Sequence, residues 1–223
     1  MKTALFCIIF GLFTLNVSGQ SSFTVSYTDD NIIPDRQDPL VGHYTINQNL
    51  PSGGNNFNSF SDLADAANSA GLSGHVVVDV VEGSGPYYER FVLGQLPNSS
   101  PENTLTINGN GEVLQHRAAL HSQRATVRLT GTSHVTFNQL IIKALGEPFP
   151  PPLSSEYGYA VDIYGKADHV TFYQCQMITN TQAESNWFRP VIVRSNATTQ
   201  EAASHLTIEE CLIVGGQQGM SIE

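Results

Sequence analysis

The sequence predicts an all-β protein built as a parallel solenoid, in which the chain winds through successive coils of short strands. The motif SHVTF at 133–137 returns as DHVTF at 168–172 and as SHLTI at 204–208, at intervals of 35 and 36 residues. After residue 74 the chain is a series of short β-branched runs separated by Gly, Asn, Ser and Pro. A motif that recurs at a near-constant interval is typical of stacked repeats.

The N-terminal segment 1–19 is predicted to be a signal peptide. Lys2 precedes an apolar run over 4–15, and the small residues at 17–19 suit a signal peptidase. We therefore expect a secreted protein, extracellular or at the cell surface. No later stretch approaches the roughly 18 consecutive apolar residues that a membrane span needs, so no membrane span is predicted.

Residues 20–50 are read as a polar N-terminal extension, with a first strand within GHYTINQNL at its end. The region 51–73 is predicted to hold the helix that caps the solenoid. Ser59 or Ser61 can cap its N-terminus, and Gly71 is expected to end it. The predicted apolar face of this helix comprises Phe60, Leu63, Ala64 and Ala67.

The coils are predicted to occupy 74–223. In the three aligned copies, apolar residues alternate with an outward Thr, which indicates strands with one buried face. We expect Phe137, Phe172 and Ile208 to lie in one interior column, about 4.8 Å apart. Cys175 and Cys211 fall in another shared column, where we interpret them as buried free thiols, with a disulfide as the alternative.

Three stretches resemble a known family: FSDLADAANSAGLSG at 60–74, HVVVDVVEGSGPYYERFVL at 75–93 and VTFYQCQM at 170–177. Over roughly 44–223 the chain is similar to right-handed parallel β-helix proteins of the pectin-lyase-like superfamily, and to secreted bacterial β-helix repeat proteins in particular. The resemblance implies the fold and its right-handed winding. It does not assign an activity, because the superfamily includes lyases, hydrolases, esterases, isomerases and adhesins.

The last residues, QGMSIE at 218–223, align with YAVDI at 159–163 and with PVIV at 190–193. These two stretches each open a coil, so the chain stops in the middle of a winding. We expect a solenoid truncated at its C-terminal end, with further coils beyond residue 223; the alternative is an unusual cap at this end.

The charge of the chain limits its partners. The formal net charge is −10, from 20 acidic and 10 basic residues, so unspecific binding to nucleic acid is not expected. One local basic cluster breaks this background; it comprises His116, Arg117, His121, Arg124 and Arg128. The cluster can contact a uronate-bearing polymer, and the resemblance implies an Arg or Lys base in a lyase; the alternative is plain solvation of outward strand positions.

Two insertions, at 144–158 and 179–189, interrupt the winding at equivalent places in adjacent coils. They are expected to lie side by side and to form a rim of aromatic and polar groups suited to sugar rings. The alternative is that the aromatic residues only pack these loops onto the solenoid wall. The candidate substrate-binding residues are Phe149, Tyr157, Trp187, Phe188 and Arg189 from the insertions, with Arg117, Arg124 and Arg128 from the basic cluster.

The three motif histidines, His134, His169 and His205, are interpreted as an outward-facing stack. No carboxylate recurs beside all three, so the prediction is that the protein has no metal site and no cofactor.

The resemblance extends to pectin methylesterases, but that activity is disfavoured. Tyr159 stands where that family has a Gln, and RPVIV at 189–193 lacks the family's nucleophilic Asp. Asp162 and Asp168 remain, and both are expected to be solvated.

These observations favour a monomeric, secreted protein that binds or processes extracellular polysaccharide. If the protein is an enzyme, we expect a polysaccharide lyase or a glycoside hydrolase; the catalytic residues are not identified. The alternative function is a structural or adhesive surface module without catalysis.

Overall fold

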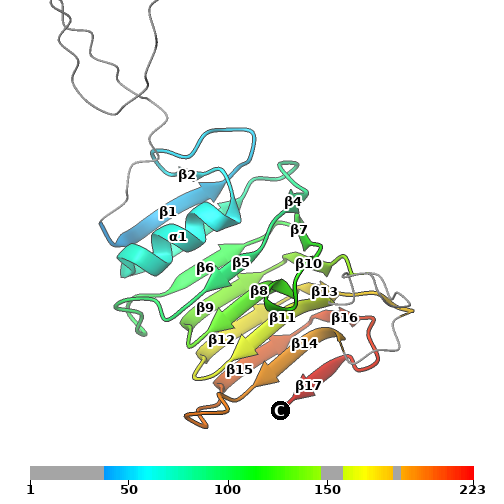
Figure 1. Cartoon of the computed structure of the whole chain (residues 1–223). Coiled ribbons are helices and arrows are strands. Elements are labelled where there is room, and N and C mark those ends of the chain that lie inside the picture. Colours follow the sequence, from blue (N-terminus) through cyan, green and yellow to red (C-terminus); the bar gives the residue numbers. More distant parts are fainter. Residues whose placement is uncertain (1–37, 147–157, 183–186) are drawn as a thin grey trace, which may run out of the picture. The chain divides into compact units, whose positions relative to one another are not determined.

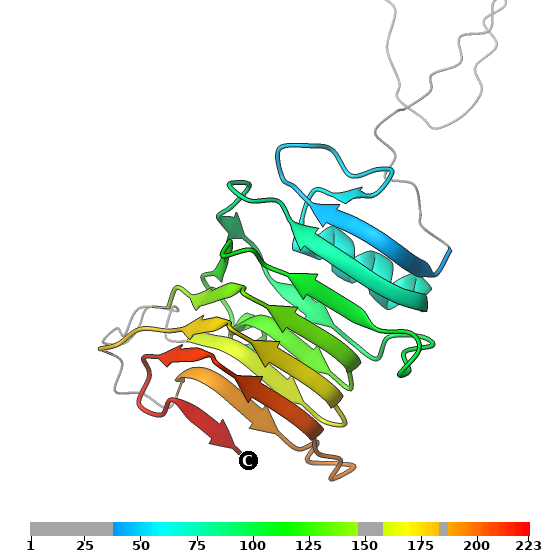
Figure 2. The same ribbon diagram turned by 180° about the vertical axis from the view of Figure 1, so that it is seen from behind.

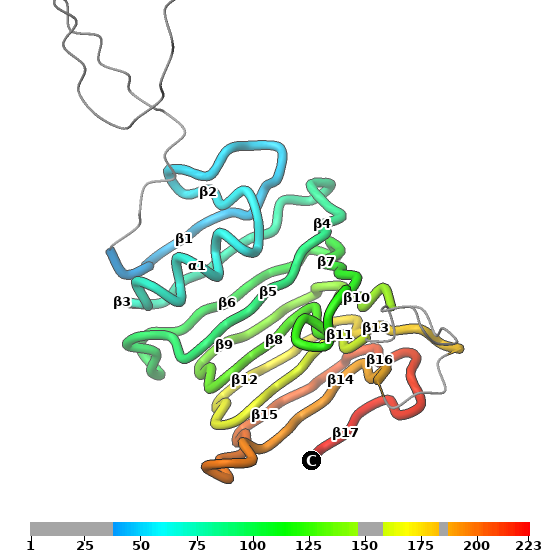
Figure 3. The backbone as a smooth tube through the Cα atoms, viewed as in Figure 1, coloured from blue at the N-terminus to red at the C-terminus, as the bar shows by residue number. Residues whose placement is uncertain are grey.

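The protein is a parallel β-solenoid of about five turns. The computed structural model describes residues 38–146, 158–182 and 187–223. Each turn contributes one strand to each of three parallel sheets, and Figure 1 shows the strands of successive turns stacked along the solenoid. The backbone trace in Figure 3 follows this winding from the N-terminal coil to the C-terminal coil. The predicted all-β parallel β-helix is confirmed.

The first sheet has seven strands. It lies at the front in Figure 2, which shows the molecule of Figure 1 from behind. In spatial order its strands are β2 (Asn56–Phe57), β1 (Leu40–Ile46), β3 (Leu72–Val80), β6 (Leu105–Asn108), β9 (Ser133–Asn138), β12 (Asp168–Tyr173) and β15 (Ser204–Glu209). The last three carry the repeated motif of the sequence.

The second and third sheets have five strands each. The second comprises β4 (Tyr87–Tyr88), β7 (Val113–His116), β10 (Ile141–Ala144), β13 (Gln176–Ile178) and β16 (Leu212–Val214). The third comprises β5 (Phe91–Leu93), β8 (Ala125–Thr130), β11 (Gly158–Tyr164), β14 (Phe188–Arg194) and β17 (Met220–Ile222). A 3-10 turn, η1 (His121–Gln123), precedes β8.

The helix α1 (Phe60–Ala70) forms where the sequence predicts it. The Ser59 hydroxyl caps it by accepting a hydrogen bond from the Asp62 backbone N–H at 3.0 Å. Gly71 ends it with a φ of 74°, a conformation that glycine adopts without steric cost. Glu89 supplies a second cap, because its carboxylate accepts bonds from the backbone N–H groups of Phe60 and Ser61, both at 2.9 Å.

Interior side chains lie in columns that run along the solenoid. Phe172 pairs with Phe137 on one side and with Ile208 on the other. The two phenylalanine rings are stacked with centroids 4.8 Å apart, and both are fully buried. The expected single column is therefore confirmed, and each coil provides the apolar surface on which the next one packs.

The two cysteines are both free thiols in this arrangement. Cys175 is buried, and its Sγ donates to the Phe137 carbonyl oxygen at 3.4 Å. Cys211 is partly exposed and donates in the same way to the Phe172 carbonyl oxygen, also at 3.4 Å. Burial raises the pKa of the Cys175 thiol to about 11.

Among the residues that the structure describes, no helix is long and apolar enough to cross a membrane. The predicted signal peptide and all of the N-terminal extension up to residue 37 lie outside the described ranges.

Candidate functional site

The outer side of the third sheet carries five of the seven arginines of the chain. These are Arg90, Arg124, Arg128, Arg189 and Arg194, and we call this surface the arginine face. Strand alternation positions it, because Val127 and Leu129 of β8 point into the core while Arg128 between them points outward. The strands beneath it are labelled β5, β8, β11, β14 and β17 in Figure 1.

A buried ion pair lies at the centre of the arginine face. Asp162 of β11 is fully buried, and both its oxygens accept hydrogen bonds from Arg194 Nη2, at 2.9 and 2.6 Å. Arg128 lies beside Asp162 in register on β8. The prediction that Asp162 is solvated was wrong, because the guanidinium from the next coil folds over it.

Tyr164 joins two of these arginines across three strands. The Arg128 guanidinium lies 5.7 Å from the centroid of its ring, and that of Arg194 lies 5.3 Å from it. A cation over an aromatic face is attracted by the ring quadrupole. The tyrosine therefore helps to hold two positive groups close together on adjacent coils.

A second group of aromatic and basic side chains lies at the other end of the same strands. The Arg124 guanidinium lies 4.8 Å from the Tyr159 ring centroid and 5.6 Å from that of Trp187. His121 packs edge-on against Trp187, with centroids 5.0 Å apart. Trp187 remains 41% exposed, so this group offers solvent a flat apolar ring beside a positive charge.

Among the described residues, the arginine face carries more positive than negative charge. The carboxylates described on it are Asp162 and Glu223, the partner of Arg189. Burial lowers the pKa of Arg90, and the nearby Arg128 lowers it further. The pKa of His121 is lowered by burial first and then by the surrounding arginines. The positive charge of the face thus disfavours the binding of a further proton and would favour the binding of an anion.

Two residues expected on an exposed rim are buried instead. Phe188 is fully buried and pairs with Gly158, whose missing side chain leaves room for the ring: a Cβ there would lie 2.8 Å from it. Arg189 is only 8% exposed and bonds Ser221 Oγ at 3.0 Å as well as Glu223. Its Nε is buried and has no hydrogen-bond partner among the described residues.

The other predicted site residues divide into three groups. Arg124, Arg128 and Trp187 lie together on the arginine face, whereas Arg117 is exposed in the connection between β7 and η1. Phe149 and Tyr157 fall outside the described residues. The bases of the two insertions do lie side by side, since the Gly158 N–H donates to the Trp187 carbonyl at 2.9 Å.

Sequence reasoning missed four residues of this face. It did not identify Arg90, Tyr164 and Arg194, and it did not predict that Tyr159 would stack with Arg124. The available signal was the register of the repeats. Aligning the coils places Thr130, Tyr164 and Arg194 in one column and Arg128 beside Asp162.

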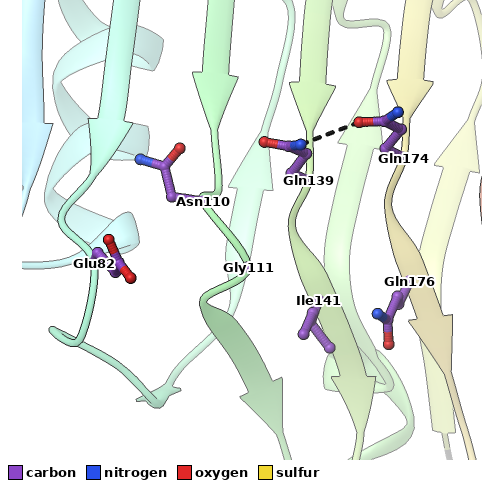
Figure 4. Close-up of a pocket in the computed structure, with 7 residues that line it drawn as sticks. All are labelled: Glu82, Asn110, Gly111, Gln139, Ile141, Gln174 and Gln176. Atoms are coloured by element: carbon purple, nitrogen blue, oxygen red, sulfur yellow. Dashed lines mark hydrogen bonds between the residues drawn. The ribbon is translucent and has the colours of Figure 1, made fainter.

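A separate groove of about 660 Å³ lies where first-sheet strands bend into second-sheet strands (Figure 4). It is lined by Glu82, Asn110, Gly111, Gln139, Ile141, Gln174 and Gln176. Gln139 donates to Gln174 at 3.0 Å, and Gln174 donates to Glu210 at 2.7 Å. These amides satisfy one another along the solenoid, and the lining has no aromatic side chain and one carboxylate. We therefore regard the arginine face as the stronger candidate site.

The fold places the chain among the parallel β-solenoid proteins. No family model, no curated protein and no solved structure matches it significantly.

Proposed function

We propose that the protein is a secreted β-solenoid that binds an anionic, uronate-bearing polysaccharide along the arginine face. The observation that carries this proposal is the concentration of five arginines on one sheet of a chain whose formal net charge is −10. A basic surface on an acidic protein is a local feature, and it suits a ligand with carboxylates at intervals.

The chemistry of the face supports a sugar acid in particular. Guanidinium groups donate paired hydrogen bonds to carboxylates. Exposed indole rings pack against the apolar faces of sugar rings. Arg124 and Trp187 provide these two groups side by side, so one uronate unit can meet both.

Binding is favoured over turnover by the state of the carboxylates. Asp162 and Glu223 each form an ion pair with an arginine, so within the described part of this face neither is free to act as a general acid or base. A distant relationship to the pectin-lyase-like superfamily is part of the proposal and is supported by the repeat motif. The alternative, a structural or adhesive module, needs no ligand at this face.

The proposal is tested by measuring binding to polygalacturonate and to a neutral glucan, by affinity electrophoresis and calorimetry. We expect Arg124→Gln and Trp187→Ala each to weaken polygalacturonate binding roughly tenfold, about 1.4 kcal/mol, and added salt to weaken it further. Lys166→Gln is the matched control, since it removes one exposed charge in the turn after β11.

Three results would count against the proposal: equal binding of the neutral glucan, equal losses in Lys166→Gln and Arg124→Gln, or no binding of polygalacturonate at all. The last result would favour the structural module. An ultraviolet-absorbing unsaturated product would instead indicate a lyase.

A further inference from the structure

A column of three stacked histidines lies at the start of β9, β12 and β15. His134, His169 and His205 have φ angles of 55°, 50° and 47°, so the backbone presents the same bend in each coil. Consecutive rings are stacked with centroids 4.8 and 4.3 Å apart. The expected outward stack is therefore present. Thr104 occupies the next place in the column and separates His134 from His75, two coils away.

The column next to the histidines holds two serines with an aspartate between them. Ser133 and Ser204 pair in register with Asp168, which stands between them. Asp168 Oδ2 lies 2.9 Å from His169 Nδ1, and its Oδ1 lies 2.8 Å from His205 Nδ1. The sequence indicated no carboxylate common to all three histidines, but two of them share this one.

We propose that Asp168, His169 and His205 form a binding site for a divalent transition metal ion, and that Zn²⁺ is the ion it suits. Imidazole nitrogen and carboxylate oxygen are ordinary zinc ligands, and three protein ligands leave a fourth position for water. The three ligand atoms already lie within 4.8 Å of one another.

The side chains can close the remaining distance without moving the backbone. Ligands about 2.1 Å from a tetrahedral ion lie roughly 3.4 Å apart. His169 and His205 are exposed, and the Asp168 side chain is 33% exposed, so their torsions are held by their mutual stacking and hydrogen bonds and not by burial in the core. The parallel strands beneath them hold the backbone positions at a constant spacing.

The hydrogen bonds of Asp168 also direct its carboxylate at the two histidines. The Ser204 hydroxyl donates to Asp168 Oδ1 at 2.7 Å, and the Nδ1 atoms of His205 and His169 lie beside its two oxygens. A bound metal ion would take the place of the Nδ1 protons that the carboxylate now accepts. This site involves the first sheet and is independent of the proposed polysaccharide binding.

The test is a titration of the full chain, without an affinity tag, with Zn²⁺ in competition with a chromophoric chelator at pH 7.5. We expect one ion per chain, and at least a roughly tenfold loss of affinity in His169→Ala, His205→Ala and Asp168→Asn. His75→Ala is the matched control, because His75 is an exposed first-sheet histidine of the same column that Thr104 separates from the stack. It bonds to Thr104 at 3.0 Å and lies two coils before His134. His75→Ala should leave the affinity unchanged.

Cobalt provides a readout that does not depend on variants. Co²⁺ bound to the unmodified protein should give visible absorption bands of a low-symmetry nitrogen and oxygen site, and equimolar Zn²⁺ should abolish them. Non-saturable binding, equal losses in His75→Ala and His205→Ala, or a cobalt spectrum identical to that of the hydrated ion would overturn the proposal. Circular dichroism of each variant without metal checks that its fold is kept.

Discussion

Removing Arg194 should expose the energetic cost of the charge buried under the arginine face. Asp162 has no exposed surface, and Arg194 provides three hydrogen bonds to it, at 3.2, 2.9 and 2.6 Å. Arg194→Met keeps much of the side-chain volume and leaves the carboxylate buried without this partner. Breaking one half of a buried ion pair costs about 3–5 kcal/mol.

The expected loss in the free energy of unfolding lies at the lower end of that range, about 3 kcal/mol, because Arg128 lies beside Asp162 in register and partly compensates its charge. Urea unfolding at pH 7, followed by circular dichroism, measures it. The double variant Asp162→Asn with Arg194→Met removes the buried charge as well, so it should recover most of the loss.

Lys166→Met is the control for a single charge on the surface and should change stability by no more than about 0.5 kcal/mol. The reasoning is refuted if Arg194→Met costs less than about 1 kcal/mol. It is equally refuted if the double variant is no more stable than Arg194→Met, since the penalty would then not come from the unpaired carboxylate.

Three further predictions concern the core, the helix cap and the thiols. Phe172→Ala should cost about 3–5 kcal/mol in guanidinium unfolding, because its ring is fully buried in a stacked column; Phe172→Leu, which fills much of the space, should cost clearly less. Glu89→Ala should destabilise the protein by about 1–2 kcal/mol by removing the acceptor at the N-terminus of α1, and Glu89→Gln should recover part of this loss. Iodoacetamide at pH 8 should label Cys211 before Cys175, because a buried thiol with a pKa near 11 is scarcely ionised there; peptide mass spectrometry identifies the site, and faster labelling of Cys175 would contradict its burial.

The winding of the chain was predictable because its repeats keep the same residue types in the same columns. Phe137, Phe172 and Ile208 occupy equivalent places in three copies of one motif, and they stack as the motif predicts. The helix was predictable for a local reason: Ser59 and Gly71 bound an apolar periodicity that needs no tertiary information.

The burial of Phe188 was not predictable from its own segment. The stretch 179–189 reads as a polar loop with two aromatic residues, but β14 begins at Phe188. Its ring fits because the residue beside it on β11 is Gly158. That pairing joins residues thirty positions apart, and the two insertions that precede them differ in length. The pairing can therefore be recognised only once the register of the strands is known.

Only part of the candidate site was predictable from the sequence, because some of its residues come together only through the register of the coils. Arg124, Arg128 and Trp187 were identified because arginines clustered in sequence and aromatic insertions are visible locally. Asp162 and Arg194 were not, since neither belongs to a local cluster of charged residues in the sequence. Their ion pair forms between adjacent coils.

The inner and outer columns of the solenoid differ in what determines their residue types. Val127, Val161 and Val191 repeat one residue type at one inner position, since each side chain packs against its neighbours in the coils above and below. On the outer side, Arg128 and Asp162 lie in one column and Ile192 follows them, so no such packing rule fixes their identity. A solenoid needs no buried charge there for its fold, and a buried carboxylate is costly unless it is paired. Under the proposed function, the buried Asp162 would hold the surrounding guanidinium side chains in place for the anionic ligand, and its hydrogen bonds to Arg194 are the contacts through which it would do so.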